Sequence, residues 1–159
     1  MKRELKSGPS IGDLDDTPVS YSMTEGVVTL RPSASVAEVA RVMAKEKIHS
    51  VVVANPLEPG QDPRGSWGVI SDLDLLAAAR TPEATAGSLA ASPSLTVSPE
   101  ESLGRVARLM RDYQASHVLV VGFDGVPLGV VSTLDIARVL AKRLVTPDSR
   151  PLTTPETPQ

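Results

Sequence analysis

Two stretches of the chain repeat each other, and this repeat constrains the fold more than any other feature. Residues 29–43, TLRPSASVAEVARVM, align without a gap with residues 96–110, TVSPEESLGRVARLM, and seven of the fifteen positions are identical. Further along, GVISDLDLL at 68–76 aligns with GVVSTLDIA at 129–137. A short unit that cannot bury a core alone is expected to pack against its copy. The sequence therefore predicts two similar halves related by a pseudo-two-fold axis.

The two copies differ in length at one place, between two apolar segments. The first copy has NPLEPGQDPRGSW at 55–67 where the second has GFDGVPL at 122–128, so the spacing between equivalent residues falls from 67 to 61. Both segments are rich in Pro and Gly, which is typical of a turn between strands. We expect a hairpin in each copy, with a longer connection in the first, because surface loops tolerate added length.

The hydrophobic pattern predicts the order β-α-β-β-α in each copy. Ser35 and Ser102 are expected to cap helices, because apolar residues follow them at helical spacing. Short β-branched or apolar runs indicate strands. The predicted strands cover 27–30, 50–54, 67–70, 94–97, 117–122 and 128–131, and further helices cover 72–80 and 134–144. The predicted fold class is therefore α/β (α+β).

The ends of the chain are polar and lack hydrophobic periodicity. Such segments bury too little apolar area to offset the entropy of ordering. We expect a disordered N-terminal tail at 1–18, a first repeat at 19–80, a second repeat at 81–145 and a disordered C-terminal tail at 146–159.

The composition argues against several classes of protein. The 159 residues include no cysteine, which excludes a disulfide scaffold, a thiolate metal site and a cysteine nucleophile. The net charge of −3 argues against a nucleic-acid partner, since such proteins usually carry a basic surface. No apolar run approaches the ~18 residues of a membrane span, and no apolar segment follows the basic N-terminus. We expect a cytoplasmic protein without a membrane partner.

The repeated pattern resembles a tandem pair of cystathionine-β-synthase (CBS) domains, also called a Bateman module. The features that carry the resemblance are residues 22–54 followed by GVISDLD, and their echoes at 94–122 and in GVVSTLD; together they cover roughly residues 20–143. The resemblance implies a regulatory module that is not an enzyme. It also implies ligands that contain adenosine, such as AMP, ADP, ATP or S-adenosylmethionine, bound in two clefts between the repeats. No cofactor is required, and a homodimer and an effector protein are the expected partners.

The Ser-x-x-Asp motifs of the two copies have two interpretations. Ser71 with Asp74, and Ser132 with Asp135, have the spacing of a capping box at a helix start. The resemblance instead implies that the serines lie near ribose or phosphate and that the aspartates accept hydrogen bonds from ribose hydroxyls. A carboxylate suits that task because charge-assisted hydrogen bonds are about twice as strong as neutral ones. One residue can do both, so the interpretations do not exclude each other.

Other candidate ligand-binding residues also follow from the resemblance. His49 and His117 precede the middle strands, where the family often has a His-Arg pair that reaches phosphate; neither has an adjacent Arg here. This departure disfavours tight triphosphate binding and favours AMP or a ligand with little negative charge, and a structural role for both histidines stays open. The resemblance also implies that the segments containing Thr24, Val28 and Leu95 line the adenine pockets. Ala91 stands where the first copy has Thr24, so the two sites are not equivalent.

The remaining features and rival functions carry less weight. Asp72 with Asp74 forms a D-x-D that repeat two lacks, which favours a solvated helix start over a metal site. Arg105, Arg108 and Arg111 are best interpreted as a solvated helix face. A CBS scaffold that binds a partner protein and no nucleotide is the main alternative function. An enzyme is disfavoured because no nucleophile–base pair or metal set is visible.

Overall fold

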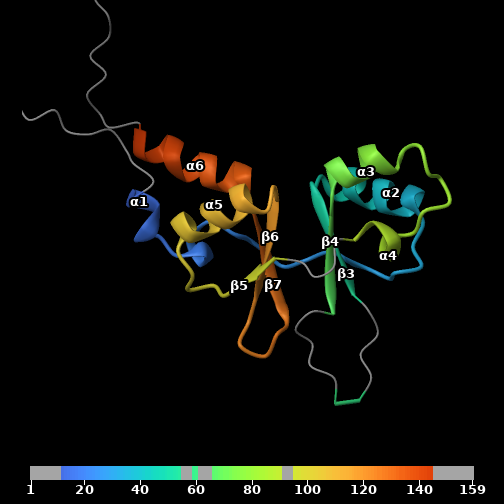
Figure 1. Cartoon of the computed structure of the whole chain (residues 1–159), viewed down its shortest axis with the longest axis horizontal. Helices are drawn as coiled ribbons and strands as arrows, with labels where there is room; N and C mark the ends of the chain where they lie inside the picture. Colours follow the sequence, from blue (N-terminus) through green and yellow to red (C-terminus); the bar gives the residue numbers. More distant parts are fainter. Residues whose placement is uncertain (1–11, 55–58, 61–65, 91–94, 145–159) are drawn as a thin grey trace, which may run out of the picture.

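The chain folds into two halves that lie side by side, as the computed structural model shows for residues 12–54, 59–60, 66–90 and 95–144 (Figure 1). Each half contains one β-sheet. The two sheets face each other across the middle of the molecule, and the helices cover their outer faces. The predicted packing of two similar halves is confirmed.

The order of elements repeats as predicted. The first half contains β2 (Thr29–Leu30), α2 (Val36–Glu46), β3 (Ser50–Ala54), β4 (Trp67–Ser71), α3 (Asp72–Ala78) and α4 (Ala86–Leu89). The second half contains α1 (Gly12–Asp15), the 3-10 helix η1 (Val19–Tyr21), β1 (Thr24–Glu25), β5 (Thr96–Val97), α5 (Leu103–Asp112), β6 (His117–Val121), β7 (Pro127–Ser132) and α6 (Thr133–Leu144). The order β-α-β-β-α therefore runs from β2 to α3 and again from β5 to α6.

The two sheets share one topology. In the first sheet, of order β2-β3-β4, β2 is parallel to β3 and β3 is antiparallel to β4. In the second sheet, of order β1-β7-β6-β5, the pairs β5–β6 and β6–β7 have the same senses. The strand β1 adds an antiparallel edge to β7, although in the sequence it immediately precedes β2 of the first sheet.

Helix capping places α2 and α5 against their sheets as the sequence predicted. The Ser35 hydroxyl accepts a hydrogen bond from the Glu38 backbone N–H at 3.2 Å, and the Ser102 hydroxyl accepts one from the Arg105 backbone N–H at 3.2 Å. Behind these caps, the predicted apolar faces are buried and pack on the strands; their buried residues include Val39, Met43, Val106 and Met110. The capped helices thus close one core on each sheet.

The contact between the halves is apolar as well. Val51 and Val53 of β3 point into the core beneath α2, and Val52, between them, points to the other face of the sheet because side chains alternate along a strand. Val52 is nevertheless only 1% exposed, and Leu119 at the equivalent position of β6 is 0% exposed. The facing halves therefore bury each other's central strands.

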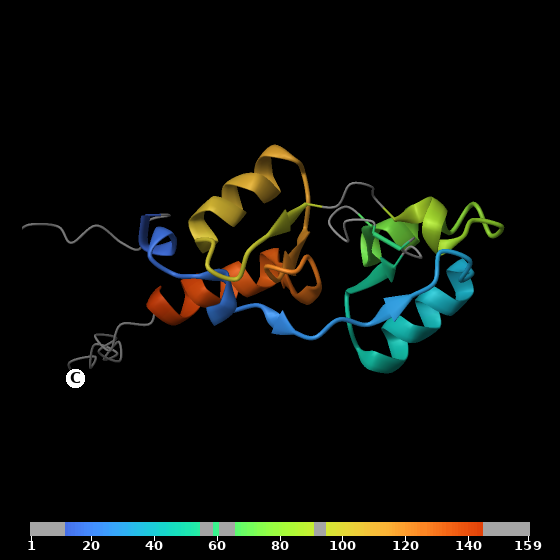
Figure 2. The same cartoon turned by 90° about the horizontal axis from the view of Figure 1, so that it is seen from below.

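Each half also packs against the segment that precedes the β-α-β-β-α unit of the other half. Val19 and Ser20 donate backbone hydrogen bonds to the carbonyl oxygens of Glu101 and Pro99, at 2.8 and 3.0 Å. At the equivalent positions, Ala86 and Gly87 donate to the carbonyl oxygens of Ala34 and Pro32, at 2.8 Å each. Figure 2 shows the chain after β1 crossing from the second half to the first. This reciprocal exchange ties the halves together and follows the pseudo-two-fold axis.

Part of the predicted N-terminal tail is ordered. Residues 12–18 were expected to be disordered, but α1 packs on α5 and Leu14 is 1% exposed within the second core. The apolar side chains of Leu14 and Val19 are too few to predict an element, yet together they fill the core beside α5. The rest of the predicted N-terminal tail, residues 1–11, and the predicted C-terminal tail at 146–159 lie outside the described residues.

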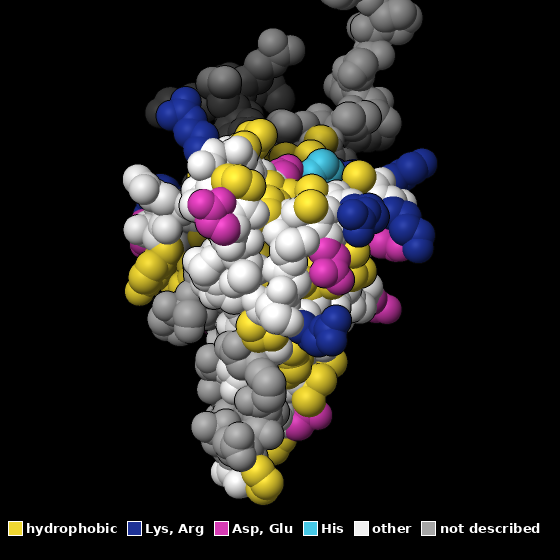
Figure 3. All heavy atoms as spheres, turned by 90° about the vertical axis from the view of Figure 1, so that its right-hand side faces the viewer, with side chains coloured by type: hydrophobic (Ala, Val, Ile, Leu, Met, Phe, Trp, Pro, Cys, Tyr) yellow, Lys and Arg dark blue, Asp and Glu magenta, His cyan; other side chains and the backbone are white. Residues whose placement is uncertain are grey.

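The outer helical face of the first half is polar and of mixed charge. Figure 3 shows Lys, Arg, Asp and Glu side chains interspersed over this face, with apolar groups between them. Within the described residues, no helix has both the length and the apolar character needed to cross a membrane.

Candidate ligand clefts

The two Ser-x-x-Asp motifs form capping boxes at the starts of α3 and α6. Oδ2 of Asp74 accepts hydrogen bonds from the backbone N–H and the hydroxyl of Ser71, both at 2.7 Å, and the Asp74 N–H donates to the Ser71 hydroxyl at 3.3 Å. Ser132 and Asp135 repeat this geometry at 2.8, 2.7 and 3.3 Å. The capping interpretation is therefore confirmed, and it holds each carboxylate in a defined orientation at the end of a strand.

The second oxygen of each carboxylate has a different environment. Oδ1 of Asp135 accepts a hydrogen bond from Nη1 of Arg138 at 3.1 Å, and Asp135 is only 6% exposed. Asp74 is partly exposed, and among the described residues its hydrogen bonds all go through Oδ2. Asp74 therefore keeps one carboxylate oxygen available for a ligand, whereas Asp135 shares one with a guanidinium group.

Each motif opens onto a cleft between the halves. The Asp74 cleft has a volume of about 460 Å³, and the Asp135 cleft has a volume of about 520 Å³. The Asp74 cleft is lined by Val69, Ser71, Leu73, Asp74, Leu95, Tyr113, Gln114, Ala115, Ser116 and His117. The Asp135 cleft is lined by Thr24, Glu25, Gly26, Val27, Val28, Lys47, Ile48, His49, Ser50, Val52, His117, Val130, Ser132, Leu134, Asp135 and Arg138.

Every residue that the sequence singled out for ligand binding lines one of these clefts. Ser71, Asp74 and Leu95 line the Asp74 cleft, and His117 lines both. The remaining predicted residues line the Asp135 cleft: Thr24, Val28, His49, Ser132 and Asp135. Each cleft thus combines the Ser-x-x-Asp motif of one repeat with the middle strand of the other repeat and with the segment just before that repeat's first strand, here called its lead-in segment. Ligand contact by these residues stays a prediction.

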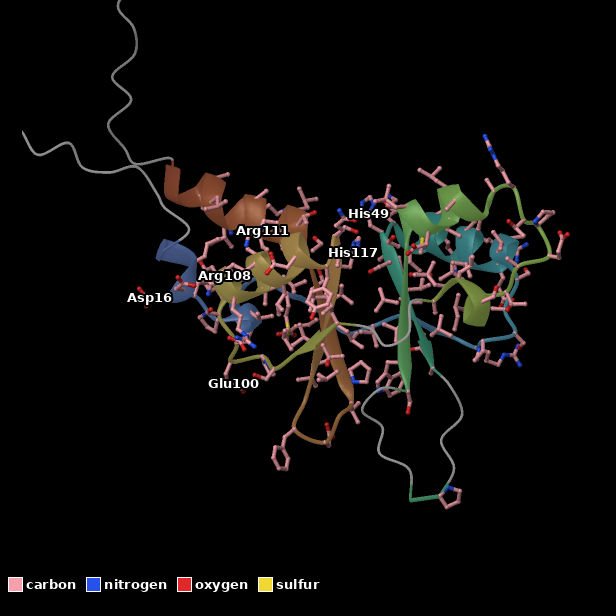
Figure 4. The ribbon with its side chains drawn as sticks, in the orientation of Figure 1. Asp16, His49, Glu100, Arg108, Arg111 and His117 are labelled. Carbon is pink, nitrogen blue, oxygen red and sulfur yellow. The ribbon has the colours of Figure 1, made fainter. Side chains whose placement is uncertain are left out.

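The two histidines approach each other where the clefts meet (Figure 4). Nδ1 of His49 lies 3.0 Å from Oδ2 of Asp72, so Asp72 has a partner that the sequence did not predict. Nδ1 of His117 lies 2.9 Å from the Ser116 hydroxyl. Burial lowers the pKa of His117 below 6.5, and His49 lowers it further, against the nearby carboxylates, chiefly that of Asp72. His117 is therefore mostly a neutral imidazole at pH 7.

Sequence reasoning missed two cations and a glutamine in the clefts. Arg138 and Lys47 line the Asp135 cleft, and Gln114, the equivalent of Lys47, lines the Asp74 cleft. Lys47 and Gln114 both have left-handed backbones, with φ of 54° and 52°. The spacing of Asp135 and Arg138, i to i+3 on a helix, was a signal that could have identified the arginine.

The arginines of α5 and the tryptophan have structural partners. Arg105 pairs with Glu101, Arg108 with Asp15 and Arg111 with Asp112, at 3.1, 3.1 and 3.0 Å. The Arg108 pair joins α5 to α1, while Trp67 donates from Nε1 to the Gly125 carbonyl oxygen of the other half at 3.0 Å. In the described part of the chain, no three His, Asp or Glu side chains form a metal-binding group.

Comparison with known proteins agrees with this geometry. The family model for the CBS domain matches residues 12–81 and 86–142, which is most of the chain. The chain belongs to the CBS-domain family. The match covers both repeats, including each Ser-x-x-Asp motif, and it confirms the resemblance noted from the sequence. The comparison with curated proteins finds no match.

Solved structures of CBS proteins share the fold. The CBS domain pair of protein MJ0100, solved with 5′-methylthioadenosine and S-adenosyl-L-methionine, is 22% identical; the alignment covers 79% of this chain and 97% of that chain, with a TM-score of 0.69. The hexameric CBS-CP12 protein from bloom-forming cyanobacteria is 27% identical over 76% and 69% of the two chains, with a TM-score of 0.67. CBSX2, solved in complex with AMP, is 24% identical over 79% and 96%, with a TM-score of 0.63.

Proposed function

We propose that this CBS pair is a regulatory module that binds an adenosine-containing ligand in the clefts between its repeats. The observation that carries this proposal is the placement of both Ser-x-x-Asp motifs at clefts of about 460 and 520 Å³, built from two repeats each. Clefts of roughly 300–1,000 Å³ are typical of small-molecule sites. The solved CBS pairs with AMP or with S-adenosyl-L-methionine support the ligand class.

The lining residues suit the parts of a nucleoside. Asp135 has accepting lone pairs beyond those used in the capping box, and its carboxylate can accept from the 2′ and 3′ hydroxyls of a ribose. Val28 and Thr24, from the opposite repeat, offer an apolar side chain and backbone polar groups to an adenine ring. AMP is the leading candidate, with ADP, ATP and S-adenosylmethionine as alternatives.

The module acts by a change of state and not by catalysis. A ligand that contacts both repeats favours the conformation in which the cleft is closed, and it shifts the population toward that state. We propose that the output passes to the partner subunit of a homodimer or to an effector protein. The hexameric CBS-CP12 relative supports assembly in general terms. A cytoplasmic location stays a prediction.

Thermal unfolding with AMP, ATP, S-adenosylmethionine and NAD tests the proposal. A ligand at 100 times its dissociation constant adds about 2.7 kcal/mol to the free energy of unfolding, so the melting temperature should rise with at least one of them. The double variant Asp74→Ala, Asp135→Ala should lose this rise. Asp16→Asn is the matched control, since Asp16 is exposed and lies at the far end of the second half (Figure 4). No rise with any of the four at millimolar concentration would contradict the proposal.

A scaffold function is the second candidate, and exposed apolar side chains favour it. Leu73 and Leu76 on α3 are 61% and 72% exposed, and Phe123 in the β6–β7 turn is fully exposed. A scaffold would bind a partner protein equally well in the Asp74→Ala, Asp135→Ala variant, with no response to nucleotides. A nucleotide-dependent change in partner binding would instead favour the sensor.

A further inference from the structure

The two clefts differ in charge at equivalent positions of the repeats. Lys47 in the Asp135 cleft corresponds to Gln114 in the Asp74 cleft, and Arg138 corresponds to Ala77. Similarly, His49 corresponds to Ser116. Among the described residues that line the clefts, the Lys and Arg side chains therefore lie at the Asp135 cleft.

The two cations approach the Asp135 cleft from opposite repeats. Arg138 extends from α6 of the second half, while Lys47 lies after α2 in the first half. Arg138 uses Nη1 to contact Asp135, and its side chain is 63% exposed, so other N–H groups of its five remain free for a ligand. Guanidinium groups form paired hydrogen bonds with phosphate, and ammonium groups bind it as compact charges.

Lys47 occupies a backbone conformation that glycine adopts at lower energy. Its φ of 54° is in the left-handed region, which is sterically unfavourable for a non-glycine residue. Gln114 has the same conformation at the equivalent position. Both side chains line their clefts. The residue at this position therefore sets the charge at the edge of the cleft, while the backbone conformation stays the same.

The Asp74 cleft differs from the Asp135 cleft in the charge of its lining residues. Among the described residues that line it, no Lys or Arg is present, and Asp74 is the charged group, with one carboxylate oxygen free of protein donors. An anionic ligand group would meet a carboxylate there with no fixed cation to offset the repulsion.

We propose that the clefts divide adenosine ligands by charge: the Asp135 cleft takes a nucleotide with a 5′-phosphate, and the Asp74 cleft takes an adenosine thioether or sulfonium whose 5′ group is neutral or positive. The proposal rests on the proposed function. Lys47 and Arg138 provide the phosphate contacts in the first cleft. In the second cleft, Asp74 binds the ribose as Asp135 does in the first, and no Lys or Arg among the described lining residues offers a phosphate contact.

Calorimetric titration of the full chain with AMP and with 5′-methylthioadenosine tests the division. The variant Lys47→Gln, Arg138→Gln should weaken AMP binding at least tenfold and leave 5′-methylthioadenosine binding unchanged. The variant Lys45→Gln, Lys142→Gln is the matched control, because these lysines are exposed, lie on α2 and α6 close in sequence to Lys47 and Arg138, and line neither cleft. Raising the NaCl concentration should weaken binding of AMP but not of the thioether.

Single variants assign each ligand to its cleft. Asp135→Ala should abolish the AMP site and keep the thioether site, and Asp74→Ala should do the reverse. Far-UV circular dichroism verifies that each variant is folded. The division is wrong if AMP binds the Lys47→Gln, Arg138→Gln variant as tightly as the wild type, or if Asp74→Ala removes AMP binding. Absence of binding of both ligands to the wild type contradicts the proposed function itself, and the division with it.

Discussion

At the scale of single residues, the same carboxylate has both a structural and a proposed binding role. Asp135 completes the capping box of α6, accepts a hydrogen bond from Arg138 and is 6% exposed. Asp74 completes the equivalent box but is more exposed and lacks the arginine. The two aspartates should therefore contribute unequally to stability, although the repeat makes them look alike in the sequence.

Asp135→Asn should lower the free energy of unfolding by about 1–2 kcal/mol, because the amide keeps the shape but loses charge-assisted hydrogen bonds in a buried place. Asp74→Asn should cost less, since water reaches its carboxylate. Urea unfolding of the two variants measures the difference. Equal losses would show that the burial of Asp135 has no energetic consequence.

His117 should make stability depend on pH. Because its pKa is lowered from 6.5 in the folded chain, the unfolded chain binds the proton more readily in the interval below 6.5. Stability is therefore full above pH 6.5, falls as the pH decreases through that value, and levels off below the folded pKa of His117. The groups that act on His117 are Asp72, His49, Asp135 and Asp74.

Melting temperatures between pH 5 and 8 measure this effect. The variant His117→Gln should lose the part of the slope that lies just below pH 6.5. His49→Gln, a change at an exposed side chain, should retain most of it. An identical slope in the wild type and in His117→Gln would contradict the assignment.

At the scale of elements, the pairing of β1 with β7 depends on a close approach of the two backbones. A Cβ atom at Gly129 of β7 would contact the Thr24 carbonyl oxygen of β1 well inside van der Waals distance. Gly26, just after β1, donates its backbone N–H to the Leu128 carbonyl oxygen at 2.8 Å. Glycine at 129 is thus required for β1 to pair with the sheet of the other repeat.

Gly129→Ala should lower the free energy of unfolding by about 1–3 kcal/mol, as expected for overpacking that shifts the backbone. Hydrogen exchange of the Gly26 amide should accelerate, because β1 separates from β7. Gly122→Ala is the control, since its closest neighbour is the Asp124 side chain, which can move. Unchanged Gly26 exchange in Gly129→Ala would contradict the role given to this contact.

The elements that were predictable from the sequence are those whose apolar pattern lies within one repeat. The capped helices after Ser35 and Ser102 and the middle strands belong to this group. In contrast, α1, η1 and β1 are short. They are stabilised by contacts with parts of the second half that lie far along the sequence, so the local pattern contains little information about them. α4 was missed for the same reason, since Ala86 and Gly87 bond to residues of the other repeat.

The same distinction applies to the clefts. Ser71, Asp74, Ser132 and Asp135 could be predicted because the motif occurs twice in register. Lys47 could not, because it meets Arg138 at one cleft only when the two halves face each other, whereas the spacing of Arg138 from Asp135 was a signal that could have identified the arginine. Their importance depends on the pairing of the repeats, which the order of residues within either repeat does not reveal.

At the scale of the whole molecule, each cleft needs both halves. The Asp135 cleft joins α6 of the second half to Lys47 and Val28 of the first, and the buried Val52 of the first half lines it as well. A ligand bound there connects the halves directly, so its binding energy stabilises their arrangement. This is how a small molecule would control the surface that the pair presents to a partner.

A crystal structure of the full chain grown with AMP tests this claim most directly. We expect AMP between the halves, with its ribose hydroxyls donating to the Asp135 carboxylate and its phosphate beside Lys47 and Arg138. AMP bound away from Asp135, or both clefts empty at millimolar AMP, would contradict it.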